Sequence, residues 1–117
     1  MAVQPYTILT DAGHKVYCVV VQWILGSGDT GQPFDGVEFP DKCVQMSGTF
    51  GAAVTMEGCN SVTSPSNWNG LTDPTQTAIS INAAGLKAIL ENPYWIRPNA
   101  GAVTSVTVQL VCAQSRS

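Results

Sequence analysis

Apolar residues along this chain fall in short runs, and clusters of Gly, Pro, Asn and Asp separate one run from the next. This punctuation is typical of an all-β protein. The runs predict strands near residues 3–9, 15–25, 43–50, 53–59, 77–82, 94–97 and 103–113.

The run 43–50 shows the alternation of a half-buried strand most clearly. One side carries Val44, Met46, Gly48 and Phe50, and the other carries Gln45, Ser47 and Thr49. Gly51-Ala52 then predicts a hairpin turn into the strand 53–59.

Two other runs predict where strands lie in the fold. The stretch 16–25 is apolar on both faces, which places it centrally or beneath a second layer. The last strand, 103–113, packs one face: Val106, Val108, Leu110 and Cys112 alternate with Thr107, Gln109 and Val111.

One short helix is expected at about 83–91, because Leu86, Ile89 and Leu90 share a helical face and Asn92-Pro93 would end it. Residues 26–42 form a long loop, of a length that is usually functional or covered by a partner. We therefore predict a single all-β domain over residues 1–117, with an N-terminal arm. Its architecture would be a two-sheet antiparallel sandwich, jelly-roll-like or related, with that one helix.

Charge is sparse. Only 11% of the residues are charged against 44% hydrophobic, so part of the surface is expected to be covered by something else. The formal charge is −3, and the five cations are scattered along the chain: Lys15, Lys42, Lys87, Arg97 and Arg116. Phosphate binding needs clustered cations, so nucleic acid is not an expected partner.

No membrane segment is expected, since the longest apolar run, 16–25, is too short for a spanning helix. The first residues lack the cationic start and apolar run of a secretory signal, so we expect no Sec-dependent export. The four cysteines have wide spacings and no C-x-x-C motif, which favours buried or partly buried thiols over a zinc site or disulfides.

Catalytic patterns are weak. The one histidine, His14, lies in a predicted turn without a nucleophile motif. The carboxylates do not form the pair that glycoside hydrolysis needs, and Glu57 is expected to be a solvated surface charge. The acids Asp29, Asp35, Glu38 and Asp41 match no calcium loop. We predict no catalytic residues, no metal site and no cofactor.

Aromatic residues are the better lead, because Trp, Tyr and Arg dominate many binding surfaces. In 94–97, Trp95 and Arg97 share one face and Tyr94 and Ile96 the other, so one pair should face the core. Pro93 and Pro98 bracket this segment and favour an edge strand or a strand end. The predicted partner-binding residues are Tyr6, Phe34, Phe39, Trp68, Trp95 and Arg97.

Several of these motifs together resemble small virion proteins of tailed bacteriophages, and in particular the capsid cement, or "staple", proteins of short-tailed phages. The similarity covers about residues 43–111. It rests on Val44-Gln45-Met46-Ser47-Gly48-Thr49-Phe50-Gly51, Glu57-Gly58-x-Asn60, Trp68, Leu71-Thr72-Asp73-Pro74, Ala84-Gly85-Leu86 and Glu91-Asn92-Pro93-Tyr94-Trp95-Ile96-Arg97-Pro98. The chain departs from the pattern at Cys59 and in the loop 61–67.

The resemblance implies a jelly-roll protein without enzymatic activity, made in the host cytoplasm and bound to the outer surface of the capsid. It would bridge subunits of a major capsid protein of the HK97-like type and pair with itself, as a homodimer across a symmetry axis. The N-terminal arm and the 26–42 loop would be attachment arms.

Our leading hypothesis is therefore a structural virion protein that stabilises a phage head. The alternative is a carbohydrate-binding or tail-adhesin module that uses Trp68 and Trp95. An enzyme is the third and weakest class, for want of a base and nucleophile pair.

Overall fold

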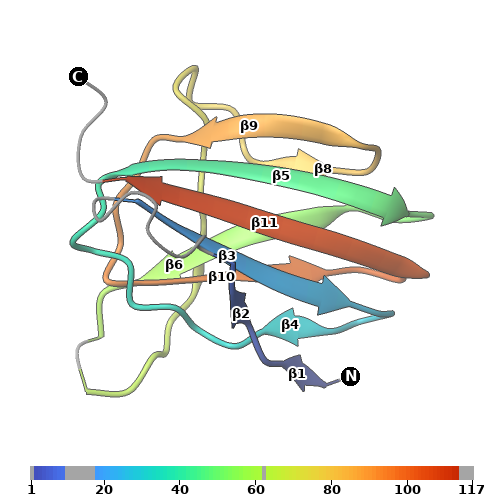
Figure 1. The fold of residues 1–117 in the computed structure, drawn as a ribbon, viewed down its shortest axis with the longest axis horizontal. Coiled ribbons are helices and arrows are strands. Elements are labelled where there is room, and N and C mark those ends of the chain that lie inside the picture. The colour runs from blue at the N-terminus through green and yellow to red at the C-terminus, as the bar shows by residue number, and fades with distance from the viewer. Residues whose placement is uncertain (1, 10–17, 62, 114–117) are drawn as a thin grey trace.

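The computed structural model describes residues 2–9, 18–61 and 63–113, which form two facing β-sheets (Figure 1). Within these ranges every regular secondary-structure element is a β-strand, which confirms the predicted all-β sandwich. In the same ranges there is no helix that could cross a membrane. The first residues of the predicted strand 15–25, and His14, lie outside the described residues.

Sheet I has five strands in the order β2-β3-β11-β5-β9, and all its pairings are antiparallel. Its strands are β2 (Thr7–Ile8), β3 (Cys18–Leu25), β5 (Asp41–Thr49), β9 (Gly85–Ile89) and β11 (Ser105–Ala113). The predicted strand 15–25 thus lies between two neighbours, as its apolar character indicated.

Sheet II has the order β1-β4-β10-β6-β7, and β8 also pairs with β6. Its strands are β1 (Val3–Gln4), β4 (Thr30–Gly31), β6 (Val54–Cys59), β7 (Asn69–Gly70), β8 (Ser80–Ile81) and β10 (Trp95–Ala100). The pairing of β1 with β4 is parallel, and the others are antiparallel. The predicted strand 3–9 is therefore two short strands, one in each sheet.

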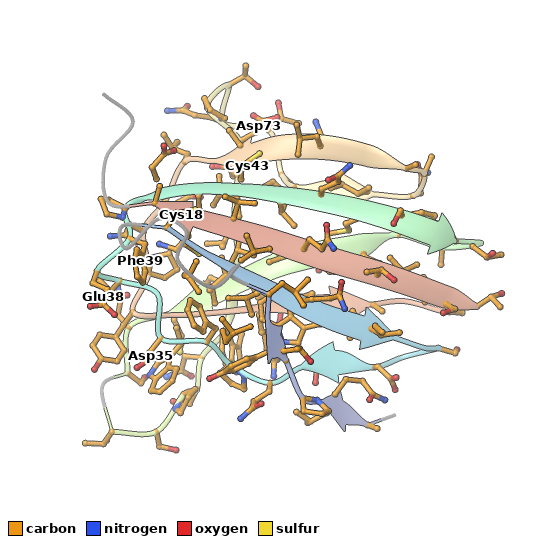
Figure 2. The ribbon with its side chains drawn as sticks, viewed as in Figure 1. Cys18, Asp35, Glu38, Phe39, Cys43 and Asp73 are labelled. Atoms are coloured by element: carbon orange, nitrogen blue, oxygen red, sulfur yellow. The ribbon has the colours of Figure 1, made fainter. Side chains whose placement is uncertain are left out.

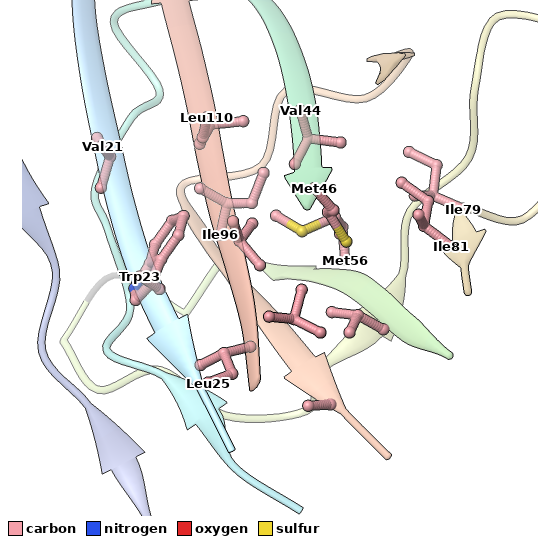
Figure 3. Close-up of a cluster of buried hydrophobic side chains, with 14 of the residues drawn as sticks. Val21, Trp23, Leu25, Val44, Met46, Met56, Ile79, Ile81, Ile96 and Leu110 are labelled. Carbon is pink, nitrogen blue, oxygen red and sulfur yellow. The ribbon is translucent and has the colours of Figure 1, made fainter. Parts of the chain in front are cut away.

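The core lies between the sheets and draws large apolar side chains from both (Figure 3). Its fully buried members include Val21, Trp23, Val44, Met46, Val54, Met56, Ile96, Val106, Val108 and Leu110. The inward positions of β5 and β11 are those that the alternation predicted. Trp23 also donates its indole N–H to the backbone carbonyl of Gln32 at 3.0 Å, so its one polar atom is satisfied.

The predicted helix at 83–91 is wrong, because residues 85–89 form β9. Ile89 is buried, whereas Leu86 and Leu90 are exposed, so the three apolar residues do not share one packed face. A short apolar run is compatible with the periodicity of a helix and with that of a strand. In this fold the run forms a strand because it pairs with the edge of β5, from Lys42↔Ile89 to Met46↔Gly85.

The predicted hairpin at Gly51-Ala52 is also wrong. The strands on either side of it belong to different sheets, because β5 pairs with β11 and β9 while β6 pairs with β10. The segment therefore crosses from sheet I to sheet II, with Gly51 at φ +91°. A glycine turn is a local signal, and it does not say whether the next strand folds back or crosses over.

The prolines do not mark an edge strand, since β10 lies between β4 and β6. The alternative prediction, a strand end, holds for Pro93, which lies just before β10 begins at Trp95. Pro98 has no N–H to donate. The bonds on this side of β10 come from the residues two before and two after it, because Ile96 donates to Phe34 and Ala100 donates to Asp29. Gly31 makes room for it there. A Cβ added at Gly31 would lie 2.5 Å from the Pro98 ring and 2.6 Å from Trp23.

The 26–42 loop is attached to sheet II. It contains β4, and Phe34 exchanges backbone hydrogen bonds with Ile96 at 2.9 and 3.0 Å. The buried carboxylate of Asp29 accepts hydrogen bonds from the backbone N–H of Gly26 and the side chain of Gln4, at 2.8 and 2.9 Å. Asp29 therefore joins the loop to the N-terminal arm.

Candidate functional site

Three of the six predicted partner-binding residues meet on the outer face of sheet II. In β10, Ile96 is buried while Trp95 and Arg97 point outward and are half-buried. The predicted core pair is thus confirmed for Ile96 alone, because Tyr94 is half-buried and its ring packs against Trp95. Trp68 comes from the loop before β7 and covers Arg97, with the guanidinium carbon 4.1 Å from the centre of its ring. This distance is within the range of a cation–π contact.

Glu57 completes this group. Its carboxylate accepts hydrogen bonds from Nε of Arg97 and from the side-chain amide of Asn99, each at 3.0 Å. The strand register brings them together, because Glu57 of β6 pairs with Arg97 of β10. Glu57 is thus part of a paired network rather than the isolated surface charge expected from the sequence. We call Glu57, Trp68, Arg97 and Asn99 the arginine cluster.

Trp95 lies beside the arginine cluster, where β10 begins. Its indole N–H donates to the backbone carbonyl of Ser61 at 2.8 Å, and its ring meets Tyr94 edge-on with centroids 5.3 Å apart. Both contacts hold the tryptophan in place while leaving part of it exposed. A partner would therefore meet side chains whose conformations are already fixed, which lowers the entropic cost of binding.

The other three predicted residues lie elsewhere. The ring of Tyr6 meets Phe34 and Trp23 edge-on, with centroids 5.5 and 6.3 Å apart. Phe34 is only 7% exposed, and Phe39 is half-buried against the core. Tyr6 and Phe34 therefore pack together where the N-terminal arm meets the sandwich, while Phe39 packs against the core near Lys42. None of the three joins the arginine cluster. Figure 2 labels Phe39 and its neighbours in the 33–40 segment.

A pocket of about 530 Å³ opens where β6 ends. Its lining is mostly amides, hydroxyls and small residues: Gly58, Cys59, Asn60, Ser61, Ser66, Asn67, Asn69, Gly70, Leu71, Glu91, Asn92 and Pro93. Asn60 also accepts a hydrogen bond from the backbone N–H of Tyr94 at 2.9 Å, which joins the pocket wall to β10.

Glu91 is the carboxylate of this pocket, and its partner is Thr72. Burial acts to raise the pKa of Glu91, but hydrogen bonds from the backbone N–H and the hydroxyl of Thr72 outweigh it, so the pKa lies below its usual value. Such a group is a poor general acid near neutral pH. Across residues 2–9, 18–61 and 63–113, no three His, Cys, Asp or Glu side chains gather in a way that could hold a metal ion.

The sequence reasoning missed Lys42, which is fully buried. Its ammonium donates to the backbone carbonyl of Phe39 at 2.7 Å and to the side-chain carbonyl of Asn92. Burial lowers the pKa of Lys42, while the nearby Cys112 acts in the other direction. The sequence did indicate this burial. Lys42 precedes Val44 and Met46 by two and four residues, so in one strand its side chain shares their inward face.

No family model and no curated protein sequence matches this chain. Solved structures do match. A cupin domain from Bordetella pertussis Tohama I is 10% identical with a TM-score of 0.58, over 97% of this chain and 96% of that one. YomS, a protein derived from the SPBc2 prophage, is 14% identical with a TM-score of 0.61, over 85% of this chain and 96% of that one.

The chain has a cupin-like, jelly-roll β-sandwich fold. A recombinant oxalate oxidase in complex with glycolate shares it, at 11% identity and a TM-score of 0.54, over 96% of this chain and 52% of that one. At such identities the likeness shows the fold alone, and function has to be argued from the side chains of this chain.

Proposed function

We propose that this protein is a structural virion protein, without enzymatic activity, that binds the outside of an icosahedral phage capsid and staples neighbouring major capsid subunits of the HK97-like type. The observation that carries this proposal is the arginine cluster with the adjacent Trp95, a surface of ordered aromatic side chains and a paired arginine on the β-sandwich. The fold shared with the prophage-derived YomS is consistent with a phage origin.

The chemistry of this surface suits a protein partner. Trp and Arg side chains that are partly buried and fixed before binding are the residues that most often dominate the energy of protein interfaces. Glu57 neutralises Arg97, so the surface carries no strong net charge that would select a highly charged ligand. Many copies on a symmetric shell would then add up weak individual contacts.

The test is to add the purified protein back to capsid shells that lack it. We expect wild-type protein to bind the shells and to raise the temperature at which they open. Trp68→Ala should weaken shell binding by about tenfold or more, because it removes an anchoring aromatic side chain. Trp68→Phe, which keeps a ring over Arg97, should lie between the two.

Leu90→Ala is the matched control, since Leu90 is 47% exposed after β9 and lies outside the arginine cluster and outside both expected attachment arms. It should bind shells as wild type does, and thermal melting of each variant should show that the domain remains folded. Wild-type protein that neither binds shells nor changes their opening temperature would refute the proposal.

The alternative, a carbohydrate-binding or tail-adhesin module, is favoured by one observation. The pocket beside Trp95 is lined mostly by amides and hydroxyls, together with the apolar Leu71 and Pro93 and the carboxylate of Glu91, a combination that suits the hydroxyls and the ring face of a sugar. Binding of the isolated protein to a glycan array, lost in Asn67→Ala and Trp95→Ala, would support this function. A lack of glycan binding alongside shell binding would leave the structural function standing alone.

A further inference from the structure

Lys42 of β5 presents an amine to the side-chain amide of Asn92, which precedes β10. Its Nζ donates to Oδ1 of Asn92 and, at 2.7 Å, to the backbone carbonyl of Phe39. Since Oδ1 is bonded to Cγ, the lysine nitrogen lies beside the carbon atom of a primary amide. An amine and an amide that are held together in this way have the groups needed for a new amide bond, provided that the amine is neutral.

The hydrogen bonds fix which way the Asn92 amide points. Its Nδ2 donates to the backbone carbonyl of Val37 at 2.9 Å, and its Oδ1 accepts from Lys42. A backbone carbonyl only accepts and an ammonium only donates, so the two ends of the amide cannot be exchanged. The carbonyl group of Asn92 therefore faces the amine. Asn92 is also exposed, so ammonia released from Nδ2 would reach water directly.

Burial favours the neutral form of Lys42. The whole residue is removed from solvent, and a Cβ added at Gly36 would lie 3.3 Å from its Cε. This burial lowers the pKa of Lys42 below its ordinary value of 10.5. At a given pH a larger share of Lys42 is therefore neutral, and nucleophilic, than of an exposed lysine.

The titratable groups around Lys42 do not hold its proton in place near neutral pH. Cys112 of β11 acts to raise the pKa of Lys42 when it is ionised, but burial raises the pKa of the Cys112 thiol itself to about 12. Cys18 of β3 acts on that thiol in the same direction as burial. The carboxylate of Glu91 is bonded to Thr72 instead.

The other lysine that the structure describes has a different environment. The side chain of Lys87 is 41% exposed, and its Nζ lies 3.5 Å from the carboxylate of Asp73. An exposed ammonium beside a carboxylate keeps its proton. Among the described lysines, the contact between a buried amine and an amide is thus specific to Lys42.

We propose that Lys42 and Asn92 form an intramolecular isopeptide bond in the folded protein. The neutral Nζ attacks Cγ, the bond between Cγ and Nδ2 breaks, and Nδ2 leaves as ammonia with one proton from Nζ. The reaction needs no oxidant, and it lowers the mass of the chain by that of one ammonia, about 17 Da. The charged Lys42 described above is the unreacted form. The product ties β5 of sheet I to the segment before β10 of sheet II.

The intact mass of the full chain tests this bond. Protein kept at about pH 6 should react slowly, and incubation at about pH 9.5 should produce the lighter form about tenfold faster or more, because only the neutral amine attacks. Protein that is already lighter when isolated supports the bond as well. The linked form should also melt about 10 °C higher, because a closed ring of residues 42–92 restricts the unfolded chain.

Trypsin digestion of the denatured product locates the bond. The unlinked chain gives the separate peptides 16–42, 43–87 and 88–116, since Pro98 blocks cleavage after Arg97. In the linked chain trypsin cannot cut after Lys42, so residues 16–87 remain joined to 88–116. Incubation in guanidinium chloride separates the two reacting groups and should give the separate peptides at either pH.

Variants identify the reacting groups. Lys42→Met and Asn92→Ala should keep the full mass, whereas Lys87→Arg, the matched control, should lose ammonia as wild type does. A wild-type chain that keeps its full mass at both pH values would overturn the proposal, and this result does not depend on whether any variant folds. A loss that persists in Lys42→Met would also overturn it, because it would come from another asparagine, such as Asn69 before Gly70.

Discussion

Lys42 donates a hydrogen bond to the side chain of Asn92, although the two residues lie 50 positions apart in the sequence. Lys42 belongs to β5 of sheet I, and Asn92 precedes β10 of sheet II. A second bond from Lys42 to the Phe39 carbonyl, at 2.7 Å, holds the end of the 26–42 loop. One buried cation therefore joins three segments at the end of the sandwich.

This buried cation predicts a pH dependence of stability. Burial lowers the pKa of Lys42 in the folded protein below its ordinary value of 10.5, so between these two pKa values the unfolded chain binds more protons. The free energy of unfolding should then rise with pH across this window. Below the folded pKa the cost of the buried charge is present in full.

The variant Lys42→Met isolates this effect. The difference in unfolding free energy between Lys42→Met and wild type should change in favour of wild type as the pH rises toward 10.5. Urea unfolding at a series of pH values measures it. A difference that stays constant with pH would contradict the assignment of Lys42 as a buried cation.

Cys112 should resist alkylation in the folded protein. It is fully buried, and burial raises the pKa of its thiol to about 12, although the nearby Lys42 acts to lower it. The thiolate is the reactive form, so both accessibility and ionisation protect Cys112. With iodoacetamide at pH 8, peptide mapping should find Cys112 modified about a hundredfold more slowly in native than in urea-unfolded protein. Equal rates in the two states would show that the site is not closed.

Gly31 predicts a steric effect. Gly31→Ala would place a Cβ against Pro98 and Trp23 and should destabilise the fold by about 1–3 kcal/mol. Gly70→Ala is the control, because a Cβ there meets nothing within 4 Å, and it should change stability by less than about 0.5 kcal/mol. Thermal and urea unfolding of both variants give the comparison. Similar stabilities for the two would show that β4 can move away from β10.

Asp29 should hold the N-terminal arm. The hydrogen bonds from Gly26 and then from Gln4 lower the pKa of Asp29 below its ordinary value of 3.8. The stability that they supply is present above this value and is lost as the pH falls through the folded pKa. In Asp29→Asn, the backbone N–H groups of Thr30 and Gln32, which bond to the arm, should exchange with deuterium faster. Unchanged exchange would mean that β1 stays attached without the carboxylate.

Much of the fold could be predicted because apolar and polar residues alternate along β5, β10 and β11. The inward residues of β5 and β11 follow from the sequence, and so does the inward position of Ile96 in β10. The strand partners could not be predicted in the same way. Residues 85–89 form a strand because they pair with the edge of β5. The chain crosses between the sheets at Gly51 because β5 and β6 pair with different strands.

The candidate site was predicted in part for the same reason. Trp68, Trp95 and Arg97 could be named from their residue types, but Glu57 and Asn99 join them only through the register of β6 with β10. By residue type, Phe34 and Tyr6 were as good candidates as Trp68 and Trp95, yet their rings pack against each other. Residue type alone does not tell whether an aromatic side chain binds a partner or packs in the core.

The most direct test of the proposed function is electron cryo-microscopy of phage heads to which the purified protein has been added, compared with heads without it. The account predicts density for the β-sandwich on the outer surface of the shell, across a boundary between major capsid subunits, with Trp68 and Trp95 toward the shell. A particle whose outer shell carries no copy of this protein would contradict it.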